Sequence, residues 1–125
     1  MGNIRVDQME ASLGITLSSY GGEVAETVRQ AVKAAGADCR KEIQRRSPKR
    51  TGKYRKGWRS ETVYDGPGGI RVRVYNQTDG QLTHLLENGH AKTGGGRVEG
   101  KPHIRPAEQK VERELLQNIK EALEG

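Results

Sequence analysis

The sequence predicts an α+β fold in which a small antiparallel β-sheet packs against two helices. Apolar residues recur every three or four positions over 23–46 and again over 106–123, and they alternate with polar residues over 70–76. The first spacing is typical of amphipathic helices, and the second of a strand with one buried face. A chain of 125 residues with this order of elements is most simply a single domain spanning 1–125.

Composition limits how much such a domain can bury. Only 32% of the residues are hydrophobic, Phe is absent and 17 residues are Gly, so we expect a thin core that is completed against a partner or further copies of the chain. The net charge of +6 favours contact with polyanions or acidic protein surfaces. The single Cys39 fits a reducing cytosol, and we find neither a long apolar run nor a secretory signal. We therefore expect no membrane contact and a place in the cytoplasm, or in something assembled there.

The first segment, from Ile4 to Tyr20, is predicted as a short helix. Asp7 would cap it, and three apolar residues would share one face: Met9, Leu13 and Leu17.

A longer helix is predicted from Glu23 to Arg46, after a break at Gly21-Gly22. Its apolar stripe is formed by Val24, Val28, Val32, Ala35, Cys39 and Ile43. The stripe is either a self-association seam or the surface that covers the sheet of its own domain, and we favour the second interpretation. Pro48 lacks a backbone N–H and its ring clashes with the preceding turn, so we expect the helix to stop near Arg46.

The segment Ser47-Pro48-Lys49-Arg50-Thr51-Gly52, here called the helix–strand junction, separates this helix from two predicted antiparallel strands. Gly52 would give the backbone the freedom to turn into the first strand. The strands and the glycine-rich turn that joins them are expected at Gly57–Asp65, Ile70–Asn76 and Gly66–Gly69. Trp58 and Val63 are expected to help fill the core, although they lie on opposite faces of a regular strand. A bulge or a second covered face would reconcile their positions.

A short helix and a glycine-rich arm are predicted next. Leu82, Leu85 and Leu86 indicate the helix, which ends at Asn88-Gly89. The arm, Gly89–Lys101, has few apolar residues and contains Gly94-Gly95-Gly96, so we expect it to be flexible in the isolated chain. A long arm in a small domain usually binds something or is ordered by a neighbour.

The last helix is predicted from about Pro106 to Leu123, after a short strand at His103-Ile104-Arg105. Val111, Leu115, Ile119 and Leu123 would form its apolar face. The outer face would carry Glu108, Glu112, Glu114, Lys120 and Glu121.

Basic residues are concentrated around the helix–strand junction. Ten of them lie between Arg40 and Arg59 with one acidic residue, Glu42, whereas residues 107–125 include five acidic and three basic residues. Three interpretations are open. Lys53, Tyr54, Arg55 and Trp58 could bind nucleic acid, with the two aromatic rings stacking on bases. The basic run could instead meet the acidic last helix of a neighbouring subunit, or it could be a solvated helix end that complements the helix dipole, which accounts for Arg45 and Arg46 alone.

The sequence offers no convincing catalytic or cofactor site. His84, His90 and His103 with Glu87 could gather around a metal ion, but their spacings match no metal-binding pattern. Cys39 lies on the apolar stripe and is expected to be a small buried residue rather than a nucleophile. The glycine-rich segments match neither a phosphate-binding loop nor a dinucleotide loop. We therefore expect a protein without a cofactor that is not an enzyme.

The order of the motifs resembles a known family. A long helix ends in Ser47-Pro48-x-x-Thr51-Gly52, with Arg55 close behind. Paired strands, the Leu-Leu-Glu-Asn-Gly-His segment at 85–90, the glycine-rich arm and Pro102-His103-Ile104-Arg105-Pro106-Ala107 follow. This order resembles the tail-component (tail-completion, head–tail joining) proteins of long-tailed bacteriophages. The chain departs from their pattern at Tyr54, where Leu is usual, and at Lys49-Arg50, where apolar or acidic residues are common.

The resemblance implies a structural protein of the virion neck, assembled in the host cytoplasm. Such proteins form a homo-oligomeric ring that joins the tail tube to the head connector, close to the DNA in the channel. The residues that we expect to contact other subunits or partners are Arg46, Lys49, Arg50 and Arg55 at the junction, His90, Lys92, Gly94, Gly95, Gly96 and Arg97 in the arm, and Glu108, Glu112 and Glu114 on the last helix. The alternative is a small basic nucleic-acid-binding protein.

Overall fold

The computed structural model describes residues 10–48, 52–78 and 80–124. The elements along the chain are β1 (Glu10–Thr16), α1 (Gly22–Arg46), α2 (Lys53–Lys56), β2 (Trp58–Gly66), β3 (Gly69–Asn76), α3 (Gly80–Asn88), β4 (Gly89–Ala91), β5 (Arg97–Glu99) and α4 (Ile104–Glu124).

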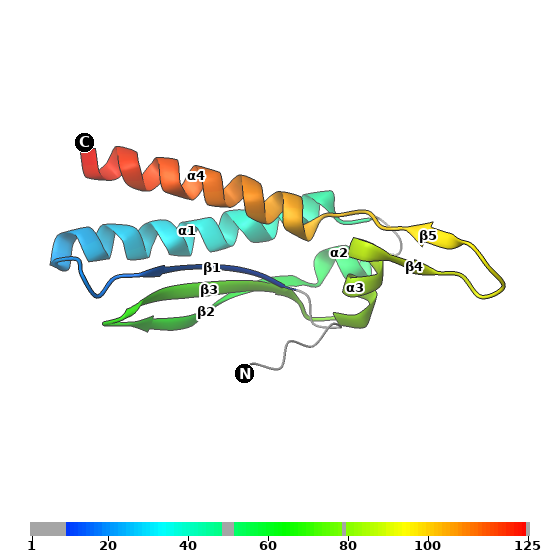
Figure 1. The fold of residues 1–125 in the computed structure, drawn as a ribbon. Helices are drawn as coiled ribbons and strands as arrows, with labels where there is room; N and C mark the ends of the chain where they lie inside the picture. Colours follow the sequence, from blue (N-terminus) through cyan, green and yellow to red (C-terminus); the bar gives the residue numbers. More distant parts are fainter. Residues whose placement is uncertain (1–9, 49–51, 79, 125) are drawn as a thin grey trace.

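The fold is α+β, as the sequence predicts. Strands β1, β3 and β2 form an antiparallel sheet in that order. Helix α1 lies along one face of the sheet, and α4 packs beside α1 in the opposite direction (Figure 1). The opposite face is polar: the Arg73 guanidinium pairs with Glu61 at 2.5 Å and lies 4.2 Å from the centre of the Tyr75 ring. The core is therefore a single layer between the helices and the sheet.

The prediction of a helix at the start of the chain is wrong over the described residues. Residues 10–16 form β1, the edge strand that pairs with β3. Ala11 and Leu13 are buried and pair with Val74 and Val72 of β3, whereas Ser12 and Gly14, which alternate with them, are exposed. Pairing with β3 thus overrides the weak helical spacing. Asp7 and Met9 lie outside the described residues.

Helix α1 confirms the prediction for this part of the chain. It ends at Arg46 and buries Val28, Val32, Ala35, Cys39 and Ile43, so the stripe covers the sheet of its own domain. Gly36 is buried in the same stripe, where an added Cβ would lie 2.4 Å from Val72 Cγ1. The glycine therefore lets α1 approach β3 closely.

The helix–strand junction leads into a helical turn that was not predicted. Gly52 has φ +85°, a left-handed conformation that favours glycine, and the four-residue α2 follows it. The turn buries Tyr54 before β2 begins at Trp58. Lys49, Arg50 and Thr51 lie outside the described residues.

The β2–β3 hairpin confirms the two predicted strands and the turn between them. A register shift between Thr62 and Tyr64 places the predicted bulge at Val63. Trp58 is fully buried, but Val63 is 45% exposed, so the prediction that Val63 fills the core is wrong. The bulge takes Val63 out of the regular alternation of β2, which is an edge strand of the sheet. Asp65 ties the hairpin to α1 through Arg29 at 2.7 Å and Lys33 at 3.0 Å.

The C-terminal third agrees in part with the sequence. Helix α3 ends at Asn88 as predicted, and α4 buries Val111 and Leu115. The predicted strand at His103–Arg105 is wrong, because α4 already begins at Ile104. Leu123 is 48% exposed, so the apolar face loses its cover toward the end of α4.

Candidate functional site

The motifs noted in the sequence converge on one buried polar cluster, which consists of Ser47, Tyr54, Trp58, Glu87 and His103. Ser47 Oγ donates a hydrogen bond to the Ile43 carbonyl at 2.7 Å and accepts one from Trp58 Nε1 at 2.8 Å. The side chains come from the end of α1, from α2, from the start of β2, from α3 and from the residue before α4. One cluster therefore joins residues 47–58 to Glu87 and His103, which lie much later in the chain.

Three aromatic rings form the centre of the cluster. The Tyr54, Trp58 and His103 rings pack edge to face, with centroids 5.6 to 6.0 Å apart. Tyr54 Oη lies 2.6 Å from His103 Nε2, and His103 Nδ1 lies 2.8 Å from the Lys101 carbonyl oxygen. Because a carbonyl can only accept, Nδ1 carries a proton and donates, and Nε2 shares a hydrogen bond with the Tyr54 hydroxyl.

Glu87 caps the start of α4 from α3. Its carboxylate accepts hydrogen bonds from the backbone N–H groups of His103, Ile104 and Arg105 at 2.7, 2.9 and 3.0 Å. His103 Nδ1 also lies 3.0 Å from Glu87 Oε1. Burial raises the pKa of Glu87, but the hydrogen bonds from the His103 side chain and from the backbone outweigh it and lower the pKa to about 2. Glu87 is therefore a carboxylate at neutral pH, held by the positive end of the helix dipole.

The buried polar cluster has the properties of a structural joint. Each of its polar side chains has a partner inside the domain. Tyr54 and Trp58 are 4% and 0% exposed, so these rings are not available to stack on the bases of a nucleic acid. That burial argues against the part of the nucleic-acid interpretation that depends on them.

The remaining chemical candidates do not form a site within the described part of the chain. Cys39 is fully buried, as predicted, and burial, aided by the charges of Glu108 and Glu42, raises its pKa to about 12. Its thiol therefore stays protonated at neutral pH. No group of three or more His, Cys, Asp or Glu side chains suited to a metal ion occurs among the described residues, and His103 and Glu87 bind each other. The His84 side chain lies outside the described residues.

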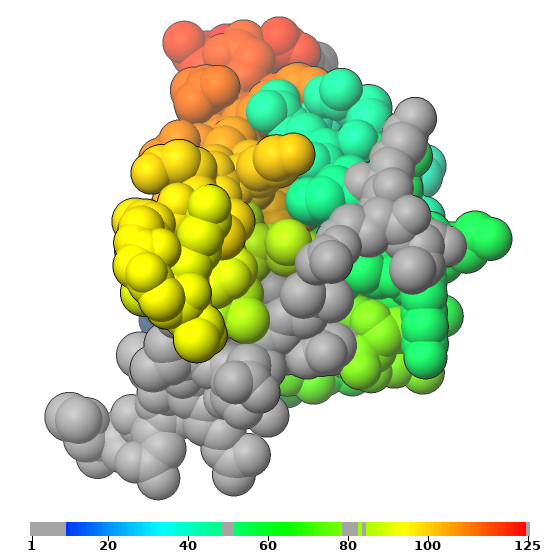
Figure 2. All heavy atoms as spheres, turned by 90° about the vertical axis from the view of Figure 1, so that its right-hand side faces the viewer, coloured from blue at the N-terminus to red at the C-terminus, as the bar shows by residue number. Residues whose placement is uncertain are grey.

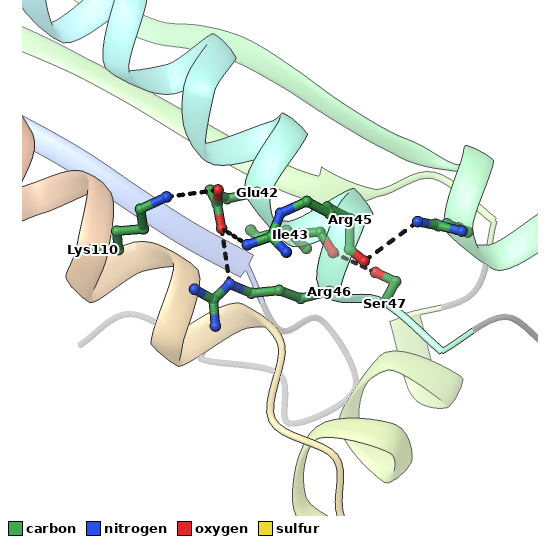
Figure 3. A network of polar contacts seen from close by, with 7 residues as sticks. Glu42, Ile43, Arg45, Arg46, Ser47 and Lys110 are labelled. Atoms are coloured by element: carbon green, nitrogen blue, oxygen red, sulfur yellow. Dashed lines mark hydrogen bonds and ion pairs between the residues drawn. The ribbon is translucent and has the colours of Figure 1, made fainter.

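Part of the basic run is neutralised inside the domain by Glu42, which the sequence analysis noted but assigned no role. Its carboxylate binds Arg45, Arg46 and Lys110 at 2.8 to 2.9 Å (Figure 3). Hydrogen bonds from Arg46, Lys110 and Arg45 lower the pKa of Glu42 to about 2. Lys110 comes from α4, so the network also clamps α4 to α1. The signal in the sequence was Glu42 itself, the one acid among ten bases.

Arg55 also has partners within the domain. Its guanidinium donates to the carbonyls of Gln44 and Arg45, at 3.0 and 3.4 Å, and so caps the C-terminus of α1. A basic groove lies beside the C-terminus of α1 and is lined by Lys41, Arg45, Arg55 and Lys56, among others. Of the four junction residues expected to contact partners, Arg46 and Arg55 thus have internal roles, and Lys49 and Arg50 lie outside the described residues.

The acidic residues expected to contact partners differ in their surroundings. Glu108 accepts a hydrogen bond from Ser12 N at 3.0 Å and so covers part of the open edge of β1. Glu112 and Glu114 are exposed, with no hydrogen bond or ion pair to another described residue. These two carboxylates remain available to a neighbour.

The predicted arm contains two short strands that the sequence analysis did not identify. Strands β4 and β5 pair through Gly89–Glu99, His90–Val98 and Ala91–Arg97. This two-stranded hairpin extends beyond the end of the helices and lies at the surface of that end (Figures 1 and 2). His90, Lys92 and Arg97 are exposed, and Gly94, Gly95 and Gly96 at the tip all have positive φ. The flexibility of this segment stays a prediction.

Comparison with protein families gives a match that spans most of the fold. The family model described as "Bacteriophage HK97-gp10, putative tail-component" matches residues 11–89, from β1 to the end of α3. The chain belongs to the HK97-gp10-like family of phage tail components. This match confirms the resemblance that the order of the motifs indicates. It also includes β1, which precedes the long helix where those motifs begin. No match was found among curated proteins or among solved structures.

Family membership indicates a structural role in the phage particle. Within the described ranges, no helix combines the length and the apolar character needed to cross a membrane.

Proposed function

We propose that this HK97-gp10-like protein works in the neck of the virion, where a homo-oligomeric ring of its subunits joins the tail tube to the head connector. The observation that carries the proposal is the family match over residues 11–89, which makes the chain a tail component. The finer role rests on the resemblance to tail-completion proteins. Its partners would be further copies of the chain, the tail-tube protein and the head-connector proteins.

The molecule consists of a packed body, formed by the three-stranded sheet and helices α1 to α4, and of the exposed β4–β5 hairpin. This division supports the proposed role. All core residues belong to the body, and the hairpin contributes none of them. A ring subunit needs a rigid body and surfaces that become buried only when neighbours are present. We assign the subunit contacts to the hairpin residues His90, Lys92, Gly94, Gly95, Gly96 and Arg97, to the junction residues Lys49 and Arg50, and to Glu112 and Glu114 on α4.

Arg46, Arg55 and Glu108 have a different place in this proposal. Each binds a group of its own domain, so each would shape the contact surface by fixing α1, α2 and β1 rather than by pairing with a neighbour alone. The basic groove that contains Arg55 would face acidic protein, because a channel that must pass DNA is hindered by a surface that grips phosphates.

Deleting the gene from the phage that encodes it tests the proposal. The expected result is separate DNA-filled heads and free tails in lysates, with joining restored by the protein supplied from a plasmid. Plasmid rescue also controls for effects on neighbouring genes. Heads and tails that join normally without the protein would refute the neck role, and tails that fail to form would assign the protein to an earlier step.

DNA binding is the alternative outcome, through Lys53 and Arg55 beside the groove. A filter-binding titration of the purified protein against duplex and single-stranded DNA at rising salt measures it. Tight binding with a steep salt dependence would favour a nucleic-acid-binding protein, whereas weak binding at physiological salt agrees with the neck role.

A further inference from the structure

We infer that the glycine-tipped hairpin of one copy seats in a groove between α1 and α4 of the next copy; this inference rests on the neck-ring proposal and specifies its subunit contact. The groove, here called the helix groove, is lined by Ala31, Ala34 and Asp38 of α1 and by Glu114, Leu115 and Asn118 of α4, among others. The proposed occupant is the β4–β5 hairpin, with its tip over Lys92–Arg97.

The helix groove has an apolar floor and acidic sides. Ala31 and Ala34 of α1 face Leu115 of α4, so small side chains leave room for a further segment of chain. Asp38 lies on the α1 side and Glu114 on the α4 side, and both are exposed. Neither carboxylate forms a hydrogen bond or an ion pair with another described residue. The groove therefore offers two free negative charges, one from each helix.

The hairpin matches the groove in shape and charge. Gly94, Gly95 and Gly96 have φ of +88°, +111° and +84° and no side chains, so the tip is thin. Lys92 follows β4 and Arg97 begins β5, so the two residues flank the three glycines. The Arg97 guanidinium donates to the Asn88 carbonyl at the base of the hairpin, so the positive charge nearest the tip is that of Lys92. A narrow tip that carries the Lys92 ammonium fits an apolar groove with a carboxylate on either side.

A chain cannot make this contact with itself. The hairpin extends away from the helices beyond the end where α4 begins, whereas the helix groove runs toward the end where α4 finishes (Figure 1). Joining two different surfaces of identical copies is a heterologous contact, and such contacts close into rings when the rotation per subunit allows it. An isolated two-stranded hairpin is marginally stable, so seating it would also supply the packing that it lacks.

Zero-length cross-linking with a carbodiimide tests the inference, because this reagent couples a lysine only to a carboxylate in direct contact. The reaction is run on a mixture of ¹⁴N- and ¹⁵N-labelled chains and on purified particles. We expect mixed-label peptides that join Lys92 to Asp38 or Glu114. The variant Lys92→Arg controls for reagent specificity, since it keeps the charge but removes the reactive amine.

Charge reversal supplies the matched variants. Arg97→Glu keeps Lys92 and both groove carboxylates and is expected to lower the Lys92 cross-link yield about tenfold or more. Changing Asp38→Lys together with Glu114→Lys removes the reacting carboxylates, so the effect of this groove reversal is measured as loss of association by sedimentation. Combining Arg97→Glu copies with groove-reversed copies is expected to recover association between them, measured by sedimentation. Glu124→Lys, on the same helix but outside the groove lining, is the control and is expected to leave the yield unchanged. Circular dichroism confirms that each variant is folded.

Two results would overturn the inference: Lys92 cross-links that avoid both groove carboxylates, or no mixed-label cross-links in solution and in particles alike. If one of these two results is obtained and the deletion phage nevertheless shows the joining defect, the neck role stands while the hairpin contact fails. If the cross-links form but heads and tails join without the protein, the contact stands and the neck role fails.

Discussion

At the scale of single residues, Glu87 links two elements that the sequence separates by a glycine-rich segment. Its carboxylate accepts three backbone hydrogen bonds at the start of α4 and contacts the His103 ring. A buried carboxylate that lost its charge would leave these donors poorly paired. Glu87 thus explains why the Glu-Asn-Gly and Pro-His-Ile-Arg-Pro-Ala segments occur together in one chain.

The first prediction concerns Glu87→Gln, which is expected to destabilise the protein by about 2 kcal/mol at pH 7, the worth of hydrogen bonds to a charged group. The folded pKa of about 2 lies below the ordinary value of 4.5, so the stabilisation by Glu87 is complete above about pH 5 and is lost as pH falls toward 2. The difference in unfolding free energy between wild type and variant is therefore expected to narrow between pH 7 and pH 3. Urea denaturation at several pH values measures it.

Glu112→Gln is the control, because Glu112 is exposed on α4, the helix that Glu87 caps, without a described partner. Its effect is expected to stay within about 0.5 kcal/mol at every pH. An undiminished difference for Glu87→Gln at pH 3 would show that the carboxylate charge is not what holds α4.

At the scale of elements, the second prediction concerns the approach of α1 to β3 at Gly36. An added Cβ would meet Val72 Cγ1 at 2.4 Å, and such overpacking costs about 1–3 kcal/mol. Alanine also favours a helix interior over glycine by up to about 1 kcal/mol. Gly36→Ala is therefore expected to lose about 1 kcal/mol net, because the clash outweighs the gain in helix propensity.

A double-mutant cycle identifies the cause. Val72→Ala removes the clashing methyl groups, so Gly36→Ala with Val72→Ala is expected to cost less than the two single changes together. Gly22→Ala is the matched control at the start of α1, where an added Cβ meets nothing within 4 Å, and it is expected to be neutral or slightly stabilising. Thermal unfolding measures the stability of each variant. If the stability losses of the two single variants simply add in the double variant, the strain of Gly36→Ala does not come from the Val72 methyl groups.

The elements also show what the sequence could and could not predict. Helices α1 and α4 and strand β3 each repeat their apolar pattern several times, so periodicity identified all three. Strand β1 was missed because seven residues containing Gly14 carry little pattern, and its partner β3 begins more than fifty positions later in the chain. Tyr54 looked available within a basic run, but α2 turns it into the core, whereas the prediction that Trp58 helps to fill the core is confirmed. Burial of that kind depends on tertiary contacts, which spacing alone does not encode.

At the scale of the whole molecule, the hydrophobic core and the β4–β5 hairpin are separate parts of the chain. The core lies in the body and includes no residue of the β4–β5 hairpin. The chain re-enters the body just after the hairpin, where Lys101 N donates to the Leu86 carbonyl at 2.7 Å. Gly89 and Glu99 are paired across the strands, so the base of the hairpin is narrow enough to be closed by a short link.

The third prediction is that replacing residues 90–99 by a Gly-Gly link leaves the body folded but abolishes joining. The melting temperature is expected to shift by less than about 5 °C, since the hairpin buries little against the body. The same variant, supplied from a plasmid to the deletion phage, is expected to leave heads and tails separate, although wild-type protein joins them. A variant with the hairpin intact and Thr93→Ser at its tip is the control for expression and is expected to rescue. Unfolding of the shortened chain would show that the hairpin belongs to the fold, and full rescue by it would show that assembly uses other surfaces.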